Sequence, residues 1–307
     1  MTEFNGTFVV ISTINNQRTE ATGRRNVKSQ PDTKPCSLGT ILLDTPKIMK
    51  KKFKITVIAI LVLVSTYLCS CTKLLFFPDK SKCMSDTECL TTTHWKQMGG
   101  FERCTPDSLR TGCWSTALAQ IAYYHKLKPY GHVEYTSRQN YKINEDLDSS
   151  QFEFSLFTPT IDTTTSQETI NQLAKYNYYA ALAVQKDFGT DRYMNKLASS
   201  SLLEQHYKVK VERYIAWHKL VPNTLGKLEK VIYKEINNKR PVFLHFANLK
   251  DFGHSIVVDG YCYKNGSFWV HTNQGQGGQD DGWYDFYKGI LRTDDNALRV
   301  VYTFKPY

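Results

Sequence analysis

The chain changes from a helical to a β-strand pattern near Pro241, and this change constrains the fold more than any other feature. Before it, apolar side chains recur at three- or four-residue steps, which predicts helices over 112–126, 167–185, 193–205 and 225–237. After it, Gly, Asn and Asp separate short β-branched or aromatic runs, which predict strands at 242–246, 255–261, 268–272, 282–287 and 299–304. Residues 130–165 are polar and aperiodic, so we expect irregular structure there. Helices followed by antiparallel strands predict an α+β fold.

One segment in each half carries residues suited to nucleophilic catalysis. Cys113 stands at the start of a predicted helix, His254 opens a predicted strand 141 positions later, and Asn273 follows 19 positions after that in a glycine-rich turn. A thiol with a pKa of about 8.5 needs its anion stabilised, which a helix N-terminus and a histidinium both do. An amide at the other imidazole nitrogen fixes the tautomer. The order therefore predicts a Cys-His-Asn site in a cleft between the halves.

Each motif alone also has a plain structural interpretation. A buried cysteine in an apolar helix is usually a small core residue. Residues 275–278 follow a strand and lack the Gly-Lys-Ser/Thr ending, so they are a turn and not a phosphate-binding loop. His245 and His271 fall in predicted strands and are interpreted as packing or surface residues. The combination of motifs, and neither one alone, favours a cysteine enzyme.

The basic charge of the chain is concentrated near its N-terminus. Residues 1–70 hold 10 Lys/Arg and 4 Asp/Glu, a surplus of +6, which leaves +4 of the net +10 for the remainder. A nucleic-acid partner is therefore not predicted.

That basic region contains the pattern of an export signal. Residues 49–54 are positively charged, and residues 55–68 form an uncharged run of 14 rich in Ile, Val and Leu. As a helix this run is roughly 21 Å long, shorter than the ~30 Å hydrocarbon core of a bilayer. We therefore interpret 49–70 as a signal peptide. Its end, Leu68-Cys69-Ser70-Cys71, resembles a bacterial lipobox, in which Cys71 is the lipidated first residue of the mature protein. An ordinary signal peptide or a short signal anchor is the alternative.

The domain organisation follows from this signal. Residues 1–48 are interpreted as sequence upstream of the true start at Met49, or otherwise as a disordered cytosolic tail. Residues 71–94 are expected to be a tether, and 95–307 the folded domain. The expected location is the bacterial cell envelope, at the outer membrane or cell surface, with the lipid membrane as a partner through N-terminal acylation.

Export permits disulfides. With Cys113 reduced, the cysteines left in the mature chain are Cys83, Cys89, Cys104 and Cys262, which allow two disulfides in three pairings. Cys83, Cys89, His94 and Cys104 also offer four zinc ligands, but their spacing fits no established ligand pattern.

Several segments of the chain resemble the streptopain family of papain-like cysteine peptidases. The segment Thr-Gly-Cys-Trp-Ser-Thr-Ala-Leu-Ala-Gln at 111–120, followed by Ile121 and Tyr124, resembles the nucleophile helix of that family. Gly-His at 253–254 with Val-Asp-Gly-Tyr at 258–261 resembles its histidine strand, and 273–278 its Asn-Trp-Gly-Trp-Gly-Gly turn. Trp-Lys-Gln at 95–97 resembles its upstream Trp-x-Gln segment. The resemblance covers 95–307 in the right order.

The resemblance implies a papain-like α+β fold, with the helical half carrying the cysteine and the antiparallel half carrying the histidine. It also implies hydrolysis of peptide bonds through an acyl-enzyme on Cys113, with His254 as general base and acid. Asn273 would orient the imidazole and Gln97 would complete the oxyanion hole. No metal or organic cofactor is implied. The expected partners are protein or peptide substrates, with a proteinaceous inhibitor as a further candidate.

The sequence departs from the family pattern at the turn. Gln274 and Gln276 stand where the family has tryptophans that shield the His–Asn pair and line the cleft. Trp-Ser replaces Val-Ala after the nucleophile, and only about two dozen residues separate Cys71 from Trp95, so no large prodomain is expected. Two alternatives therefore stay open. One is a degenerate family member that binds peptides or inhibitors without cleavage. The other is a Cys-His amidase or transglutaminase that acts on cell-wall peptides.

Overall fold

The computed structural model describes residues 78–190, 197–221 and 223–307, and the structural statements below concern these residues. The signal, Cys71 and residues 71–77 of the expected tether lie outside them. The helices are α2 (Cys113–Tyr124), α3 (Gln167–Ala183), α4 (Ser200–His206) and α5 (Leu225–Asn237). The strands are β1 (His132–Thr136), β2 (Lys142–Asp146), β3 (Val209–Ala216), β4 (Val242–Ala247), β5 (Gly253–Lys264), β6 (Ser267–Asn273), β7 (Gly282–Asp285) and β8 (Leu298–Pro306). No helix of this part of the chain is long and apolar enough to cross a bilayer.

A six-stranded antiparallel sheet forms the second half of the fold. Its strand order is β3-β8-β4-β5-β6-β7, and β1 and β2 form a separate two-stranded sheet. Strand β4 pairs with β5 in register from Val242 opposite Val258 to Ala247 opposite Gly253. Strand β5 therefore lies inside the sheet, between β4 and β6.

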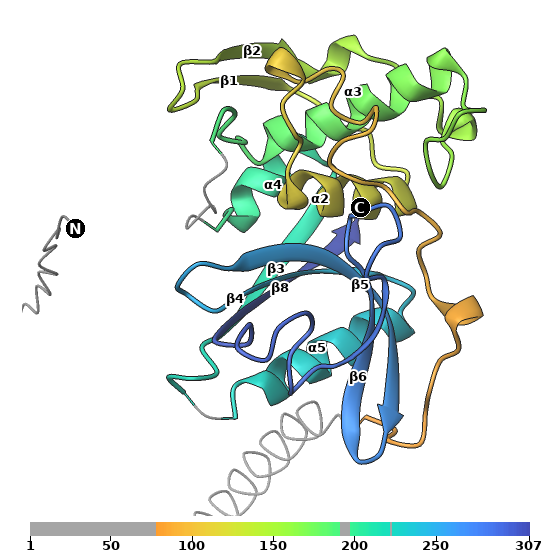
Figure 1. Cartoon of the computed structure of the whole chain (residues 1–307), viewed down its shortest axis with the longest axis vertical. Coiled ribbons are helices and arrows are strands. Elements are labelled where there is room, and N and C mark those ends of the chain that lie inside the picture. Colours follow the sequence, from red (N-terminus) through yellow and green to blue (C-terminus); the bar gives the residue numbers. More distant parts are fainter. Residues whose placement is uncertain (1–77, 191–196, 222) are drawn as a thin grey trace, which may run out of the picture. The chain divides into compact units, whose positions relative to one another are not determined.

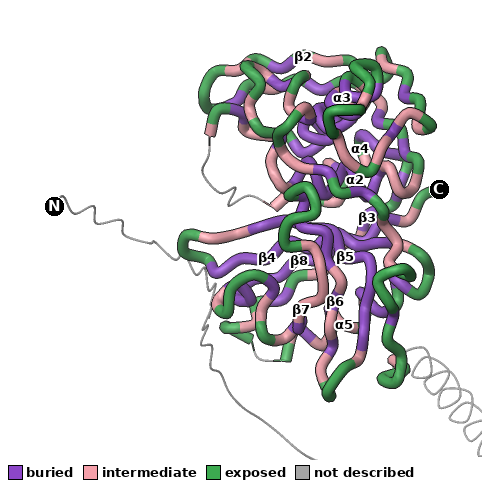
Figure 2. Tube along the Cα trace, turned by 45° about the vertical axis from the view of Figure 1, so that its right-hand side comes forward, coloured by how far each residue is buried: buried purple, intermediate pink, exposed green. Residues whose placement is uncertain are grey.

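Helices cover both faces of the sheet. Helices α2 and α3 lie above it and α5 lies below it in the view of Figure 1. Two apolar clusters fill the layers: Val257 and Phe243 belong to the cluster under α2 and α3, and Ile256 and Val258 belong to the cluster over α5. Because both faces are covered, β4 is buried at every position, as the buried central strands in Figure 2 show.

Most of the predicted elements are confirmed. The helix predicted at 225–237 has the observed bounds of α5, because its apolar residues at three- and four-residue steps bury one face against the sheet. Helices α2 and α3 also match. Of the helix predicted at 193–205, only α4 is observed, and residues 193–196 lie outside the described part of the chain.

The prediction of irregular structure for residues 130–165 is wrong, and strand β3 is missing from the predicted elements. Residues 130–165 contain β1 and β2, each of which has a single fully buried apolar residue, Val133 and Ile143, too few to give an alternating signal. Strand β3 was not predicted. It is an edge strand that pairs with β8 alone, and it lies between α4 and α5 in the sequence. Buried and exposed residues alternate only imperfectly along Val209–Ala216.

Residues 78–94, expected as part of a tether, run along the sheet half as a strap. Cys83 forms a disulfide with Cys262 of β5, and the Met84 and Leu90 N–H groups donate to the Tyr261 and Asp259 carbonyls at 3.1 and 3.0 Å. Cys89 and Cys104 are free thiols, so one of the two allowed disulfides forms. Because Cys83 is oxidised, the zinc site considered with Cys104 and His94 is excluded.

Candidate active site

Cys113 is the first residue of α2. Gly112 caps the helix with φ 90°, a backbone angle that only glycine adopts easily, and its carbonyl accepts the first helical hydrogen bond from the Thr116 N–H at 3.1 Å. This turn places the half-buried Cys113 side chain at the end of the helix where unpaired N–H groups gather. The positive end of the helix dipole therefore acts on the thiol.

His254 approaches from β5, where it pairs with Phe246 of β4. Its imidazole is buried, and its Nε2–H donates to the backbone carbonyl of Gln274 at 2.9 Å. The Phe246 ring meets the imidazole edge to face, with centroids 5.9 Å apart. Because Nε2 is engaged, Nδ1 is the nitrogen left to act on Cys113.

The two side chains titrate together. Burial opposes ionisation of the Cys113 thiol, but the hydrogen bond and charge of His254, with hydrogen bonds from Ser255, outweigh it and lower the pKa to about 7. Burial also opposes the charged form of His254, yet the thiolate and the Gln274 carbonyl raise its pKa. The arrangement therefore favours a thiolate–imidazolium pair near neutral pH.

Ser255 is a residue near Cys113 that the sequence did not reveal. Its backbone N–H and its hydroxyl are among the groups that lower the pKa of the Cys113 thiol. The same hydroxyl lies 2.9 Å from Nδ1 of His245, directly across the β4–β5 pair. Burial, followed by the charge of His254, lowers the pKa of His245 to about 3, so its imidazole is neutral. His245 is therefore more than the packing residue expected, because it holds the hydroxyl that helps to lower the pKa of Cys113.

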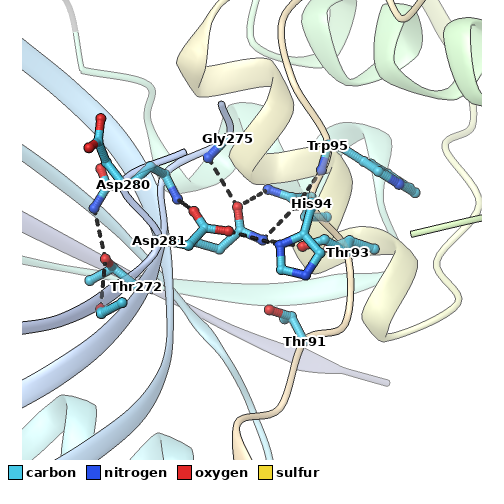
Figure 3. A network of polar contacts seen from close by, with 12 residues as sticks. Thr91, Thr93, His94, Trp95, Thr272, Gly275, Asp280 and Asp281 are labelled. Atoms are coloured by element: carbon cyan, nitrogen blue, oxygen red, sulfur yellow. Dashed lines mark hydrogen bonds and ion pairs between the residues drawn. The ribbon is translucent and has the colours of Figure 1, made fainter. Parts of the chain in front are cut away.

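The Asn273 side chain makes its hydrogen bonds to α2, to the strap and within its own turn, and its predicted role in orienting the imidazole stays a prediction. Its Oδ1 accepts from Gln120 Nε2 at 3.1 Å and from the Gly275 N–H at 3.0 Å, while its Nδ2 donates to Gln120 Oε1 and to the Thr93 carbonyl. Figure 3 shows the strap residue Thr93 and the turn residue Gly275 on either side of this network. None of the hydrogen bonds of the described residues joins the Asn273 side chain to His254. The imidazole is held by a backbone carbonyl instead.

The two glutamines of the turn lie in different environments. Gln274 is buried, its Nε2 donates to Thr272 Oγ1 at 2.7 Å, and its N–H donates to Asp281 Oδ1 at 2.6 Å. Gln276 is exposed. The other oxygen of Asp281 lies 2.9 Å from His94 Nδ1. Figure 3 shows this contact, by which the carboxylate links the strap to the turn.

Gln97 lies next to the nucleophile loop. Its carbonyl accepts hydrogen bonds from the Thr111 N–H at 3.2 Å and the Thr111 hydroxyl at 3.3 Å, two residues before Cys113. The half-buried Gln97 is therefore held close to the start of α2. Its role as oxyanion donor stays a prediction.

Comparisons with known proteins agree with this geometry. The family model described as the peptidase C10 family matches residues 95–284. Streptopain from Streptococcus pyogenes serotype M28 is 26% identical over 185 residues, which cover 57% of this chain and 45% of that protein; streptopain from serotype M1 gives the same values. The matched part of this chain thus spans less than half the length of these relatives.

Two solved structures share the fold. Active interpain A, a cysteine protease from Prevotella intermedia, aligns with a TM-score of 0.59 at 19% identity, covering 74% of this chain and 98% of that one. A fragment of prointerpain A aligns with a TM-score of 0.55 at 18% identity, covering 78% and 80% of the two chains. The predicted papain-like α+β fold is confirmed by these similarities.

Proposed function

The chain belongs to the peptidase C10 family, and from this we propose that it is a cysteine endopeptidase that cleaves protein or peptide substrates. The observation that carries the proposal is the pairing of Cys113, at the start of α2, with the His254 imidazole that β5 presents. A thiol with a pKa near 7 is about half ionised at neutral pH, far more than an ordinary thiol, and is an effective nucleophile.

The reaction follows from the positions of these groups. The Cys113 thiolate attacks the carbonyl carbon of the substrate, and an S–C bond forms as the carbonyl π electrons move to oxygen. The Cys113 N–H and the Gln97 amide are the proposed donors to this oxyanion. The imidazolium of His254 then protonates the leaving amine, the C–N bond breaks, and an acyl-enzyme remains.

Hydrolysis regenerates the enzyme. His254, now neutral, removes a proton from water, and the resulting hydroxide attacks the thioester carbonyl. Collapse of this second intermediate releases the carboxylic acid and the Cys113 thiolate, while the imidazole keeps the proton. The Gln274 carbonyl accepts the Nε2–H throughout and stabilises the imidazolium form.

The glutamines at the turn do not argue for a degenerate binding protein. The contact to His254 comes from the backbone of residue 274, which any side chain at that position leaves in place. The binding-only and amidase or transglutaminase alternatives therefore have no structural feature in their favour among the described residues.

Digestion of a denatured protein substrate under mild reductant tests the proposal. We expect cleavage by the parent chain, and its loss in Cys113→Ala and His254→Ala. Cys104→Ala is the matched control, because Cys104 is also a free, partly exposed thiol. Mass spectrometry of the products separates internal peptide cleavage from deamidation or cross-linking. Cleavage that survives Cys113→Ala, or no cleavage by a folded parent chain, would contradict the proposal.

We also propose that the chain is exported and anchored to the cell envelope through a lipid on Cys71. The sequence pattern at 49–71 motivates this, and the Cys83–Cys262 disulfide suits an oxidising compartment. Labelling with a fatty-acid analogue should mark the parent chain and not Cys71→Ser, and the labelled form should sediment with membranes. Equal labelling of Cys71→Ser would overturn the anchor.

A further inference from the structure

Outside the active site, three metal-ligating side chains from separate segments meet beside β5 and β6. They are Cys89 of the strap, Asp259 of β5 and His271 of β6, and their ligand atoms all lie within 4.8 Å of one another. His271 Nδ1 is 2.7 Å from Asp259 Oδ1. The proposed peptidase mechanism uses none of these groups.

Local irregularities of the fold bring the three together. The pairing of β5 with β6 shifts between Val258 and Gly260, and this bulge leaves Asp259 as the additional residue beside His271. A Cβ at Gly260 would lie 2.9 Å from the Cys89 sulfur, so a side chain there would displace the thiol. The glycine thus makes the room that Cys89 occupies.

The surrounding contacts hold the cluster in place and leave one side accessible. The second Asp259 oxygen accepts hydrogen bonds from the N–H and the hydroxyl of Thr91. The Trp283 ring packs on His271 with centroids 5.3 Å apart, and its Nε1–H donates to Asp86 Oδ1 at 2.5 Å. Asp259 is buried, whereas the His271 side chain is 18% exposed and Cys89 is half-buried. An ion could therefore reach the cluster from the Cys89 side.

We propose that Cys89, Asp259 and His271 bind one zinc ion, with water as the fourth ligand. A thiolate, an imidazole and a carboxylate form a mixed donor set that suits zinc and is too soft for magnesium or calcium. Binding displaces the Cys89 thiol proton to solvent, with no change in oxidation state.

The strap connects this site to the catalytic turn. Thr93, four residues after Cys89, accepts a hydrogen bond through its carbonyl from Asn273, next to the Gln274 that holds His254. Zinc at Cys89 fastens the strap to β5 and β6 at a second place besides the Cys83–Cys262 disulfide. The role inferred for the ion is structural.

The test uses the full chain with Cys36, Cys69, Cys71 and Cys113 replaced by serine, which leaves the disulfide and, as free thiols, Cys89 and its control Cys104. Cobalt(II) is the spectroscopic probe and zinc the competitor. We expect one cobalt per chain with a thiolate-to-cobalt charge-transfer band, which zinc abolishes. Zinc should also raise the melting temperature of this protein.

Matched variants decide the outcome. Cys89→Ser should remove the charge-transfer band and weaken zinc binding by at least about tenfold, and His271→Gln should weaken it similarly. Cys104→Ser should leave both unchanged. A cooperative thermal transition without metal confirms that each variant folds. A folded parent that gives no band, or a band that persists in Cys89→Ser, would overturn the site.

Discussion

His254 Nε2 lies 2.9 Å from the backbone carbonyl of Gln274, and this contact holds the imidazole. The carbonyl is positioned because the N–H of the same residue donates to Asp281 and because Asn273 ties the turn to Gln120 of α2. The orienting group is therefore a product of the turn conformation.

The first prediction concerns the pH dependence of Cys113 alkylation. Because its pKa is lowered to about 7, the thiol is protonated below that pH and the thiolate dominates above it. The rate of alkylation by iodoacetamide should therefore rise with a midpoint near pH 7, measured by mass spectrometry of the Cys113 peptide. In His254→Ala, burial still opposes ionisation while the largest stabilising partner is gone, so the midpoint should move to higher pH, toward the ordinary value of about 8.5.

Cys104 is the internal control for that measurement. Burial raises its pKa, so it should react only in the alkaline range in both proteins. A Cys113 midpoint unchanged by His254→Ala would show that the imidazole does not stabilise the thiolate.

The second prediction concerns Ser255. Ser255→Ala removes the hydroxyl that helps to lower the pKa of Cys113 and that lies 2.9 Å from His245 Nδ1. A hydrogen bond to a charged group contributes about 1.5–3 kcal/mol, so kcat/KM should fall roughly tenfold or more. The midpoint of the Cys113 alkylation profile should also move to higher pH. Ser267→Ala, on β6 and bonded to Asp285, is the control that should change neither.

The third prediction separates a structural from an orienting role for Asn273. Asn273→Ala removes hydrogen bonds to Gln120, Thr93 and Gly275 in a buried site. Unsatisfied buried groups cost about 1–3 kcal/mol each, so we expect a loss of several kcal/mol in the free energy of unfolding, measured by urea denaturation. At a temperature where the variant is folded, the midpoint of the Cys113 alkylation profile should stay near pH 7. Unchanged stability with a shifted midpoint would instead support a direct contact with His254.

The fourth prediction concerns the Cys83–Cys262 disulfide, which closes a loop across 179 positions. Cross-linking so long a segment restricts the unfolded chain, so replacing both cysteines by serine should cost about 4–5 kcal/mol. The measurement is thermal or urea unfolding of the double variant against the parent. Cys104→Ser serves as the control for loss of a thiol, and equal stability of parent and double variant would contradict the prediction.

The sequence determined the features that depend on local pattern. Cys113 and His254 could be placed at the starts of a helix and a strand because residues recur at three- or four-residue steps from Cys113, and a β-branched and aromatic run follows His254. The bounds of α5 followed from its one-sided apolar face. The family resemblance rested on side-chain types in short segments, which the sequence displays directly.

Tertiary structure alone decided which groups meet. The pairing of Cys83 with Cys262, the hydroxyl of Ser255 near the nucleophile and the convergence of Cys89 with His271 depend on how segments that lie far apart in sequence pack on one sheet. The contact to His254 could not be predicted for a different reason. Its acceptor is a backbone carbonyl, which every residue carries, so the side-chain type at position 274 gives no indication of it.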